Sequence, residues 1–249
     1  MALTAILFDL DGTVVQTREA SWDLFAETNR KFELGIDTRE QFFELFESNI
    51  FRSLARVCPD AERAEAAKQH FMQLLRTQYH PRLIPGMANV VRMLAHQVTL
   101  AVISSNTIEA IRRVLESDGI ATCFAHVFSG DVEPSKGQAI RRFLSDPAYA
   151  VRRSSPAYNE ADAADGTLNS HDVVLVTDTV GDVREARECG IRAVGVAWGM
   201  HSESQLREAG AERVALWPQE LLVWLLPERS LTEIVRDDGA RGKRLNLED

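Results

Sequence analysis

Cysteine is scarce in this chain, with only Cys58, Cys123 and Cys189 among 249 residues. Their number is odd and no two form a C-x-x-C pair, so the spacing predicts neither a disulfide framework nor a zinc site. Sparse cysteines are typical of a reducing compartment, where they serve as small apolar side chains. We therefore expect the protein to be cytoplasmic.

Long apolar runs are also lacking. No stretch reaches the length of a transmembrane helix, and the first residues show neither the charged nor the apolar region of a signal peptide. Positive charge is in deficit, because 28 lysines and arginines against 37 aspartates and glutamates leave a net charge of −9. This balance argues against nonspecific binding to nucleic acid or to an anionic membrane. An anionic substrate would need a local positive site, such as a metal ion or a lysine.

The composition is that of a globular protein with a sizeable core, at 45% hydrophobic and 26% charged residues. Short apolar runs alternate with stretches of helical periodicity, and continuous apolar character indicates strands covered on both faces. We predict the α/β class with a doubly wound parallel sheet. The expected strands are Ala5–Phe8, Val98–Ile103, Val173–Val176 and Ala193–Ala197. The expected helices between or after them are Ile108–Leu115, Gly137–Leu144 and Val183–Cys189.

Residues 18–83 interrupt this alternation, because they contain no strand-like run and their aromatic residues fall at helical spacing. Thr38-x-x-Gln41 resembles a capping box and predicts the start of a helix. A further helix is predicted over Ala61–Tyr79. We expect residues 18–83 to form a small helical cap domain inserted into the α/β core.

The core would then consist of residues 1–17 and 84–249. Within it, residues 146–172 have no sustained period and are expected to be a surface insertion, and residues 228–249 a polar tail. The hinges between core and cap are expected near Thr17–Arg18 and Leu83–Gly86.

Two carboxylates follow the first predicted strand, at Asp9 and Asp11, and are followed by Gly12 and Thr13. Open α/β sheets build their sites beyond the carboxyl ends of strands. Alternate residues of an extended segment point the same way, so Asp9 and Asp11 can face one substrate. A plain turn would also use Asp and Gly, so this pattern needs support from the rest of the chain.

Two later segments have residues suited to an anion. Ser104, Ser105 and Asn106 follow the second predicted strand, where a hydroxyl and backbone N–H groups can hold a phosphate. Lys136 precedes a predicted helix, where its charge opposes the helix dipole and a bound anion would explain its position. Each pattern alone is more typical of an ordinary helix start.

A third segment is acidic. Asp178 and Asp182 follow the third predicted strand, and two acids in such a loop can bind a hard cation through oxygen. In sequence order, these motifs resemble the haloacid dehalogenase superfamily, in its phosphoglycolate-phosphatase-like branch with a helical cap. The matching residues are Asp9, Asp11, Gly12, Thr13, Ser104, Lys136, Asp178 and Asp182. Two positions depart from the pattern: Thr177 stands where the family usually has Gly, and Gly137 follows the lysine where many relatives have Pro.

The resemblance implies a Mg²⁺-dependent phosphatase that works through an aspartyl-phosphate. Asp9 would be the nucleophile and Asp11 the general acid and then the base. Mg²⁺ would be held by Asp9, the Asp11 carbonyl and Asp178. Asp182 would orient Lys136 or a metal-bound water.

The phosphate and the rest of the substrate would be held by a second group of residues. Lys136 would act with the phosphate-binding residues Thr13, Ser104, Ser105 and Asn106. Arg52 and Arg56, one helical turn apart, are candidates to bind a substrate carboxylate. The expected partner is a small phosphorylated metabolite, and the branch resemblance suggests phosphoglycolate.

Of the other functions on this fold, we exclude dehalogenation, and the rest stay open to different degrees. A sugar-phosphate mutase shares both aspartates, but the relevant mutases typically have a histidine where this chain has Ser21. Dehalogenases typically lack an acid at the position of Asp11, and phosphonate hydrolysis needs a cap lysine where Lys31 and Lys68 are expected on solvated faces. A catalytically silent binding protein is the alternative from another class, and Mg²⁺-dependent turnover distinguishes it.

Overall fold

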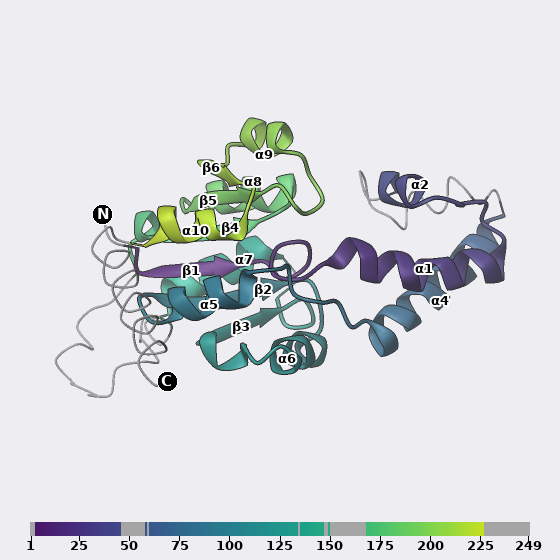
Figure 1. The fold of residues 1–249 in the computed structure, drawn as a ribbon, viewed down its shortest axis with the longest axis horizontal. Helices are drawn as coiled ribbons and strands as arrows, with labels where there is room; N and C mark the ends of the chain where they lie inside the picture. The colour runs from purple at the N-terminus through teal and green to yellow at the C-terminus, as the bar shows by residue number, and fades with distance from the viewer. Residues whose placement is uncertain are drawn as a thin grey trace, which may run out of the picture.

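The computed structural model describes residues 3–45, 58, 60–133, 135–146, 149 and 168–226. One six-stranded parallel sheet forms its centre, in the order β3-β2-β1-β4-β5-β6 (Figure 1). The strands are β1 (Ala5–Phe8), β2 (Thr99–Ser104), β3 (His126–Ser129), β4 (Val173–Thr177), β5 (Arg192–Val196) and β6 (Arg213–Ala215). The predicted α/β class with a parallel sheet is therefore confirmed.

The four predicted strands are present within one residue at either end, but β3 and β6 were missed. Both are edge strands, and an edge strand is not fully covered. The first half of β3 is only partly buried, and Arg213 at the start of β6 is exposed. Neither strand therefore has the continuous apolar run by which the central strands were predicted.

Helices cover both faces of the sheet, which makes the fold doubly wound. One face carries α5 (Met87–Ala95), α6 (Ile108–Ser117), the short helix η1 (Ala121–Cys123) and α10 (Pro218–Leu225). The other carries α7 (Lys136–Ser145), α8 (Val180–Glu188) and α9 (Glu203–Ala209). A second short helix, η4 (Ser170–Asp172), precedes β4. The predicted helices correspond to α6, α7 and α8, whereas α5, α9 and α10 were not predicted.

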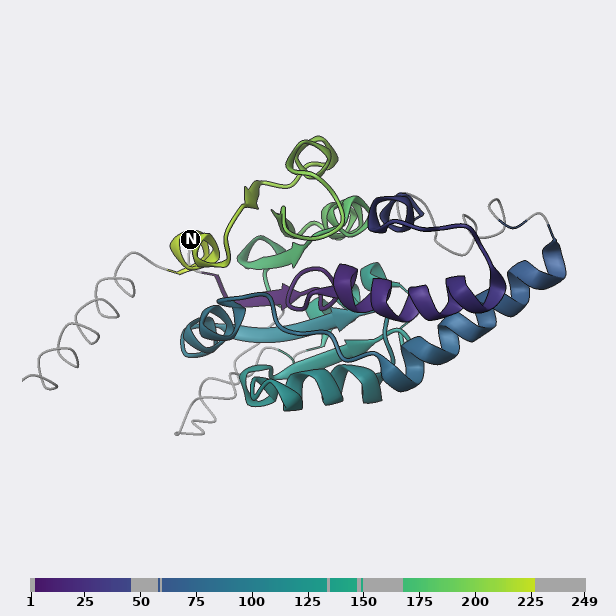
Figure 2. The same ribbon diagram turned by 45° about the vertical axis from the view of Figure 1, so that its right-hand side comes forward.

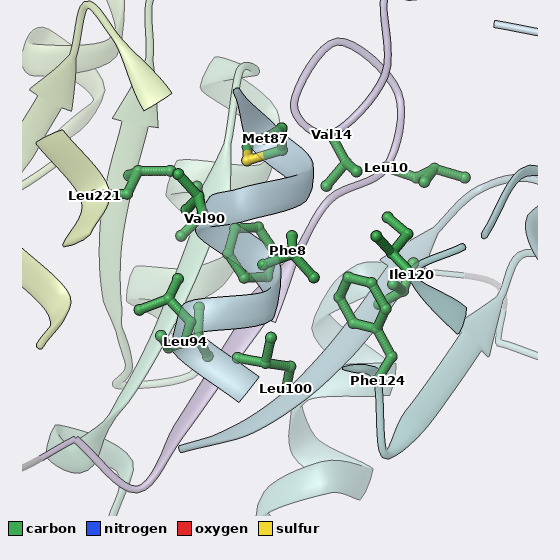
Figure 3. Close-up of a cluster of buried hydrophobic side chains, with 14 of the residues drawn as sticks. Phe8, Leu10, Val14, Met87, Val90, Leu94, Leu100, Ile120, Phe124 and Leu221 are labelled. Atoms are coloured by element: carbon green, nitrogen blue, oxygen red, sulfur yellow. The ribbon is translucent and has the colours of Figure 1, made fainter. Parts of the chain in front are cut away.

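Alternate residues of β1 divide between the two layers, as the pleat of a strand requires. Ile6 and Phe8 point into one cluster, and Ala5 and Leu7 into the other. Figure 3 shows the first cluster, in which the Phe8 ring meets the edge of Phe124 at 6.2 Å between ring centroids. This packing on both faces fixes the end of β1, where Asp9 follows.

Among the described residues between β1 and α5, three helices form a separate group, which we call the helical segment: α1 (Thr17–Phe32), α2 (Arg39–Glu44) and α4 (Ala61–Gln78). Phe25, Phe42 and Phe71 pack together at its centre, with Phe25 stacked on Phe42 at 4.6 Å. The capping box of Thr38 and Gln41 is present as predicted. The segment lies beyond the carboxyl end of β1 in both views (Figures 1 and 2).

The two connections between the helical segment and the sheet pair with each other. The amide of Gln16 donates to the carbonyl of Arg82 at 2.7 Å, and the amide of Ile84 donates to the carbonyl of Val14 at 3.0 Å. Both predicted hinge regions thus adjoin one short ladder next to the loop after β1. Most of the predicted insertion at 146–172 and the predicted tail at 228–249 lie outside the described residues. None of the helices within the described ranges is both long and apolar enough to cross a membrane.

Replacing Phe8 by alanine should lower the free energy of unfolding by about 3–5 kcal/mol, because it leaves a cavity beside a ring that is 0% exposed. Chemical denaturation measures this loss. Val132→Ala is the control, since Val132 is 62% exposed and its loss should change stability by less than about 0.5 kcal/mol. Equal losses in the two variants would contradict the packing described for β1.

Candidate active site

The loops after β1 and β4 meet the start of α7 at one point. Asp9, directly after β1, is 3% exposed, and its amide donates to the carbonyl of Val176 in β4 at 2.9 Å. The ammonium of Lys136, the first residue of α7, lies 2.7 Å from Asp9 Oδ1 and 2.5 Å from Asp182 Oδ2. The helix places this lysine because Ser135 caps it by accepting from the amide of Gln138.

Lys136 and Asp182 each stabilise the charged form of the other. Burial acts to lower the pKa of Lys136, but the carboxylates of Asp182 and Asp9 outweigh it and hold that pKa above its usual value. Burial acts to raise the pKa of Asp182, but Lys136 and hydroxyl donors outweigh it and hold that pKa below its usual value. One of these donors is Thr177, whose hydroxyl lies 2.7 Å from Asp182 Oδ2. The threonine that departs from the family pattern thus supports the acidic motif.

The negative charges of the buried carboxylates of Asp9 and Asp178 are not fully compensated by nearby positive charge or hydrogen-bond donors. Burial raises the pKa of Asp9 well above its usual 3.8, and the nearby acids Asp182 and Asp178 add to the effect, against the opposing charge of Lys136. Burial also raises the pKa of Asp178 to about 6, although its Oδ2 accepts from the amide of Met200 at 2.7 Å. Acidic groups therefore outnumber the lysine here, and additional positive charge would be favourable.

Gly12 allows the loop after β1 to approach Asp178. Its φ of +72° lies in the left-handed region, and a Cβ atom there would come within 2.1 Å of Asp178 Oδ2. Thr13, the next residue, donates its hydroxyl to Asp178 Oδ1 at 3.3 Å. The glycine of the opening motif is therefore required by a close contact with the acidic loop after β4.

Four donors surround the carboxylate of Asp11. Its Oδ1 accepts from the hydroxyls of Tyr79, at 2.5 Å, and Thr17, at 3.1 Å. Its Oδ2 accepts from Asn106 Nδ2, at 2.5 Å, and from the Ser104 hydroxyl, at 3.4 Å. Ser104 and Asn106, both suggested for phosphate binding, thus donate to one oxygen of Asp11, and side chains from the ends of the helical segment donate to the other.

The structure brings together most of the residues singled out by the sequence. The converging residues are Asp9, Asp11, Thr13, Ser104, Asn106, Lys136, Asp178 and Asp182. Ser105 is exposed and, with Ser104 and Lys136, lines a cavity of about 260 Å³ beside the site. Arg52 and Arg56 lie outside the described residues.

Sequence reasoning missed Tyr79 as a site residue. The sequence placed it at the end of a predicted helix, and the structure places it one residue beyond α4, 5% exposed and in contact with Asp11. Helical periodicity carries no information about a contact between residues 68 positions apart. Thr17, expected only as a hinge residue, likewise contacts Asp11.

A divalent cation fits the chemistry of this site. The buried carboxylates of Asp9 and Asp178 are oxygen ligands that lack full charge compensation, and Mg²⁺ prefers few carboxylates with water completing its shell. Across the described ranges, no group of three or more His, Cys, Asp or Glu side chains is arranged to hold a metal ion by itself. Asp182 contacts Lys136 and Thr177 instead, which favours the prediction that Asp182 orients the lysine.

Comparison with known proteins identifies related sequences and folds. Residues 6–196 match the family model described as "Haloacid dehalogenase-like hydrolase". "Probable phosphatase IndB" of Dickeya dadantii is 26% identical over 82% of this chain and 85% of its own length. "Phosphoglycolate phosphatase" of Synechococcus elongatus is 26% identical over 62% of each chain. A haloacid dehalogenase-like hydrolase of Streptococcus pneumoniae superposes with a TM-score of 0.72 at 20% identity, covering 90% of this chain and 99% of its own.

In chelator-containing buffer, Asp178→Asn should stabilise the protein at pH 7.5 by up to about 3 kcal/mol. A carboxyl with a pKa raised from 3.8 to about 6 binds its proton more tightly in the folded state, so its cost to stability is fully present above pH 6 and disappears as the pH falls to 4. Thermal unfolding across this pH range measures the effect. Added Mg²⁺ should raise the unfolding temperature of the wild type but not that of the variant.

Asp182→Asn is the matched control, for which we expect the opposite change in stability. The lowered pKa of Asp182 contributes stability that is present at neutral pH and is lost only as the pH falls through that lowered value. Asp182→Asn should therefore be destabilised at pH 7.5. A loss of stability in both variants would contradict the assignment of uncompensated charge to Asp178.

Proposed function

The chain belongs to the haloacid dehalogenase-like hydrolase family, and we propose that it is a Mg²⁺-dependent phosphatase that hydrolyses a small phosphomonoester through an aspartyl-phosphate. The observation that carries the proposal is the buried Asp9 carboxylate, held by Lys136 at 2.7 Å at the carboxyl end of β1. Phosphoryl transfer depends mainly on positioning and on charge neutralisation, and this pair supplies a fixed nucleophile beside a fixed cation. The two relatives named as phosphatases support the same reaction class.

The proposed reaction has two displacements. In the first, an Asp9 oxygen attacks phosphorus, the ester P–O bond breaks, and Asp11 gives its proton to the leaving oxygen. In the second, Asp11 takes a proton from water, whose oxygen attacks phosphorus and releases Asp9 and inorganic phosphate. Lys136, Ser104 and nearby donors stabilise the charge on the phosphoryl oxygens throughout.

The cofactor would be held by a small set of oxygen ligands. Asp9, the Asp11 carbonyl and Asp178 would bind Mg²⁺, which supplies charge neutralisation at the phosphoryl group. Asp182 would keep Lys136 in place, because its carboxylate contacts the lysine at 2.5 Å.

We further propose that residues 18–83 act as a cap on a core of residues 1–17 and 84–249. Arg18, in the first turn of α1, supports this role, since its guanidinium contacts the carbonyl of Gly199 at 3.5 Å and lies 4.0 Å from the ring centre of Phe43. A cap that closes over the substrate excludes water and strengthens the electrostatic interactions inside. The sparse cysteines support a cytoplasmic setting for this reaction.

The substrate would be a small phosphorylated metabolite, with phosphoglycolate as the leading candidate. The cavity beside Ser104 and Lys136, at about 260 Å³, is just below the roughly 300–1,000 Å³ of pockets for drug-sized ligands. Its lining combines serines, among them Ser105, Ser129 and Ser135, with apolar side chains, and its small volume suits a short leaving group. The relative named phosphoglycolate phosphatase supports this candidate.

Asp9→Asn should lower the turnover of an aryl phosphate with Mg²⁺ by at least about 10³-fold, because an amide oxygen is a poor nucleophile. Steady-state assays measure this loss, and mass spectrometry after acid quenching should find a phosphoryl group on the wild-type peptide that contains Asp9. Asp37→Asn, at an exposed position, is the control and should leave turnover unchanged. Absence of wild-type turnover on every phosphate tested would favour a silent binding protein.

A panel of phosphoglycolate, hexose phosphates and nucleoside monophosphates should give the highest kcat/KM with phosphoglycolate, because the small cavity favours a short leaving group. Phosphate release measures hydrolysis, and chromatography of the organic product detects isomerisation. An isomerised sugar phosphate as the main product would show a mutase, and a preference for nucleotides would contradict the substrate assignment.

A further inference from the structure

We propose that Tyr79 is a positioning residue for Asp11, holding its carboxylate in the orientation that protonates the leaving group. This inference rests on the proposed function, because it assigns to Asp11 the role of general acid. Tyr79 would not touch the reacting atoms itself. It would act through the hydrogen bond from its phenol to Asp11 Oδ1, which measures 2.5 Å.

The backbone brings Tyr79 to Asp11 from a distant part of the chain. The residue follows α4, and three residues later the chain pairs with residues 14–16, which leave the loop after β1. The phenol therefore enters the site from the side of the helical segment. Its side chain is buried, so the hydroxyl needs a partner inside the protein. That partner is the carboxylate of Asp11, with Thr17 Oγ1 at 3.0 Å.

The hydrogen bonds around Asp11 distinguish its two oxygens. Tyr79 and Thr17 donate to Oδ1, whereas Ser104 and Asn106 donate to Oδ2 on the proposed phosphate side. The Thr17 hydroxyl has a fixed direction, since its oxygen also accepts from the amide of Gly12 at 2.8 Å. With both donors in place, the carboxylate is held in one orientation.

The phenol is a lasting donor in this arrangement. A phenol keeps its proton at neutral pH, so its hydroxyl stays available to donate to Asp11 Oδ1. Removal of that hydroxyl would leave Oδ1 with the longer bond from Thr17, and the carboxylate could rotate. Misplacement of a catalytic group by about 1 Å can cost about 10²-fold in rate.

The test is Tyr79→Phe, assayed as kcat/KM on two substrates that differ in leaving group. An alkyl phosphate releases a basic alkoxide that needs a proton, whereas 4-nitrophenyl phosphate releases a weakly basic phenolate that needs little help. The ratio kcat/KM reports the steps up to phosphoryl transfer to Asp9. We expect a loss of about 10- to 100-fold with the alkyl phosphate and of less than about 3-fold with the aryl phosphate.

Tyr149→Phe is the matched control. It removes a phenolic hydroxyl from a tyrosine that packs on Phe143 and Phe128. Tyr149 follows the C-terminal end of α7, whereas Lys136 stands at the N-terminal end of that helix. The control variant should leave kcat/KM on both substrates unchanged. Tyr79→Phe should still unfold in one cooperative transition, because the ring and its packing remain, with a lower unfolding temperature from the lost hydrogen bond.

Equal losses on the two substrates, or no loss on either, would overturn the role of Tyr79. Asp11→Asn separates this outcome from failure of the proposed function. If Asp11→Asn shows the strong leaving-group dependence and Tyr79→Phe does not, only the inference about Tyr79 falls. If Asp11→Asn hydrolyses the alkyl phosphate like the wild type, both the general-acid role and the inference built on it fall.

Discussion

One ammonium group holds the acidic side chains of this site together. Lys136 lies between Asp9 and Asp182, within 2.7 Å of both, and its positive charge partly offsets the burial of three carboxyl groups that include Asp178. Removal of one partner from such a buried group leaves charge without compensation, which costs several kcal/mol. The carboxylate of Asp9, the proposed nucleophile, can therefore be buried because the first residue of α7 is a lysine that pairs with it.

The sheet explains why these groups meet. In the order β3-β2-β1-β4-β5-β6, the chain moves outward in one direction from β1 through β2 to β3, and in the other from β4 through β5 to β6. The position between β1 and β4 is therefore a switch point, and open α/β sheets bind ligands at such points. Asp9 follows β1, Asp178 follows β4, and Ser104 ends β2 beside them. Packing on both faces of β1 holds this arrangement rigidly, so the hydrophobic core positions the site.

Stability and the proposed activity oppose each other at Asp178. Its burial destabilises the folded chain at neutral pH, yet the same uncompensated charge is what would bind a cation. Asp11 shows a different arrangement, since donors from both ends of the helical segment and from the loop after β2 satisfy its carboxylate. The two acids of the opening motif, one residue apart, thus stand in different environments that suit their different proposed roles.

The α/β class, the central strands and most residues of the site could be predicted from the sequence alone, because buried parallel strands are continuous apolar runs that end in polar residues. The edge strands β3 and β6 escaped this prediction, since partly exposed strands lack that run. The hydrogen bonds from Thr177 to Asp182 and from Tyr79 to Asp11 could not be predicted and follow from the folded structure. The first contact depends on the conformation of the loop after β4, and the second joins residues 68 positions apart, a proximity that no local periodicity encodes.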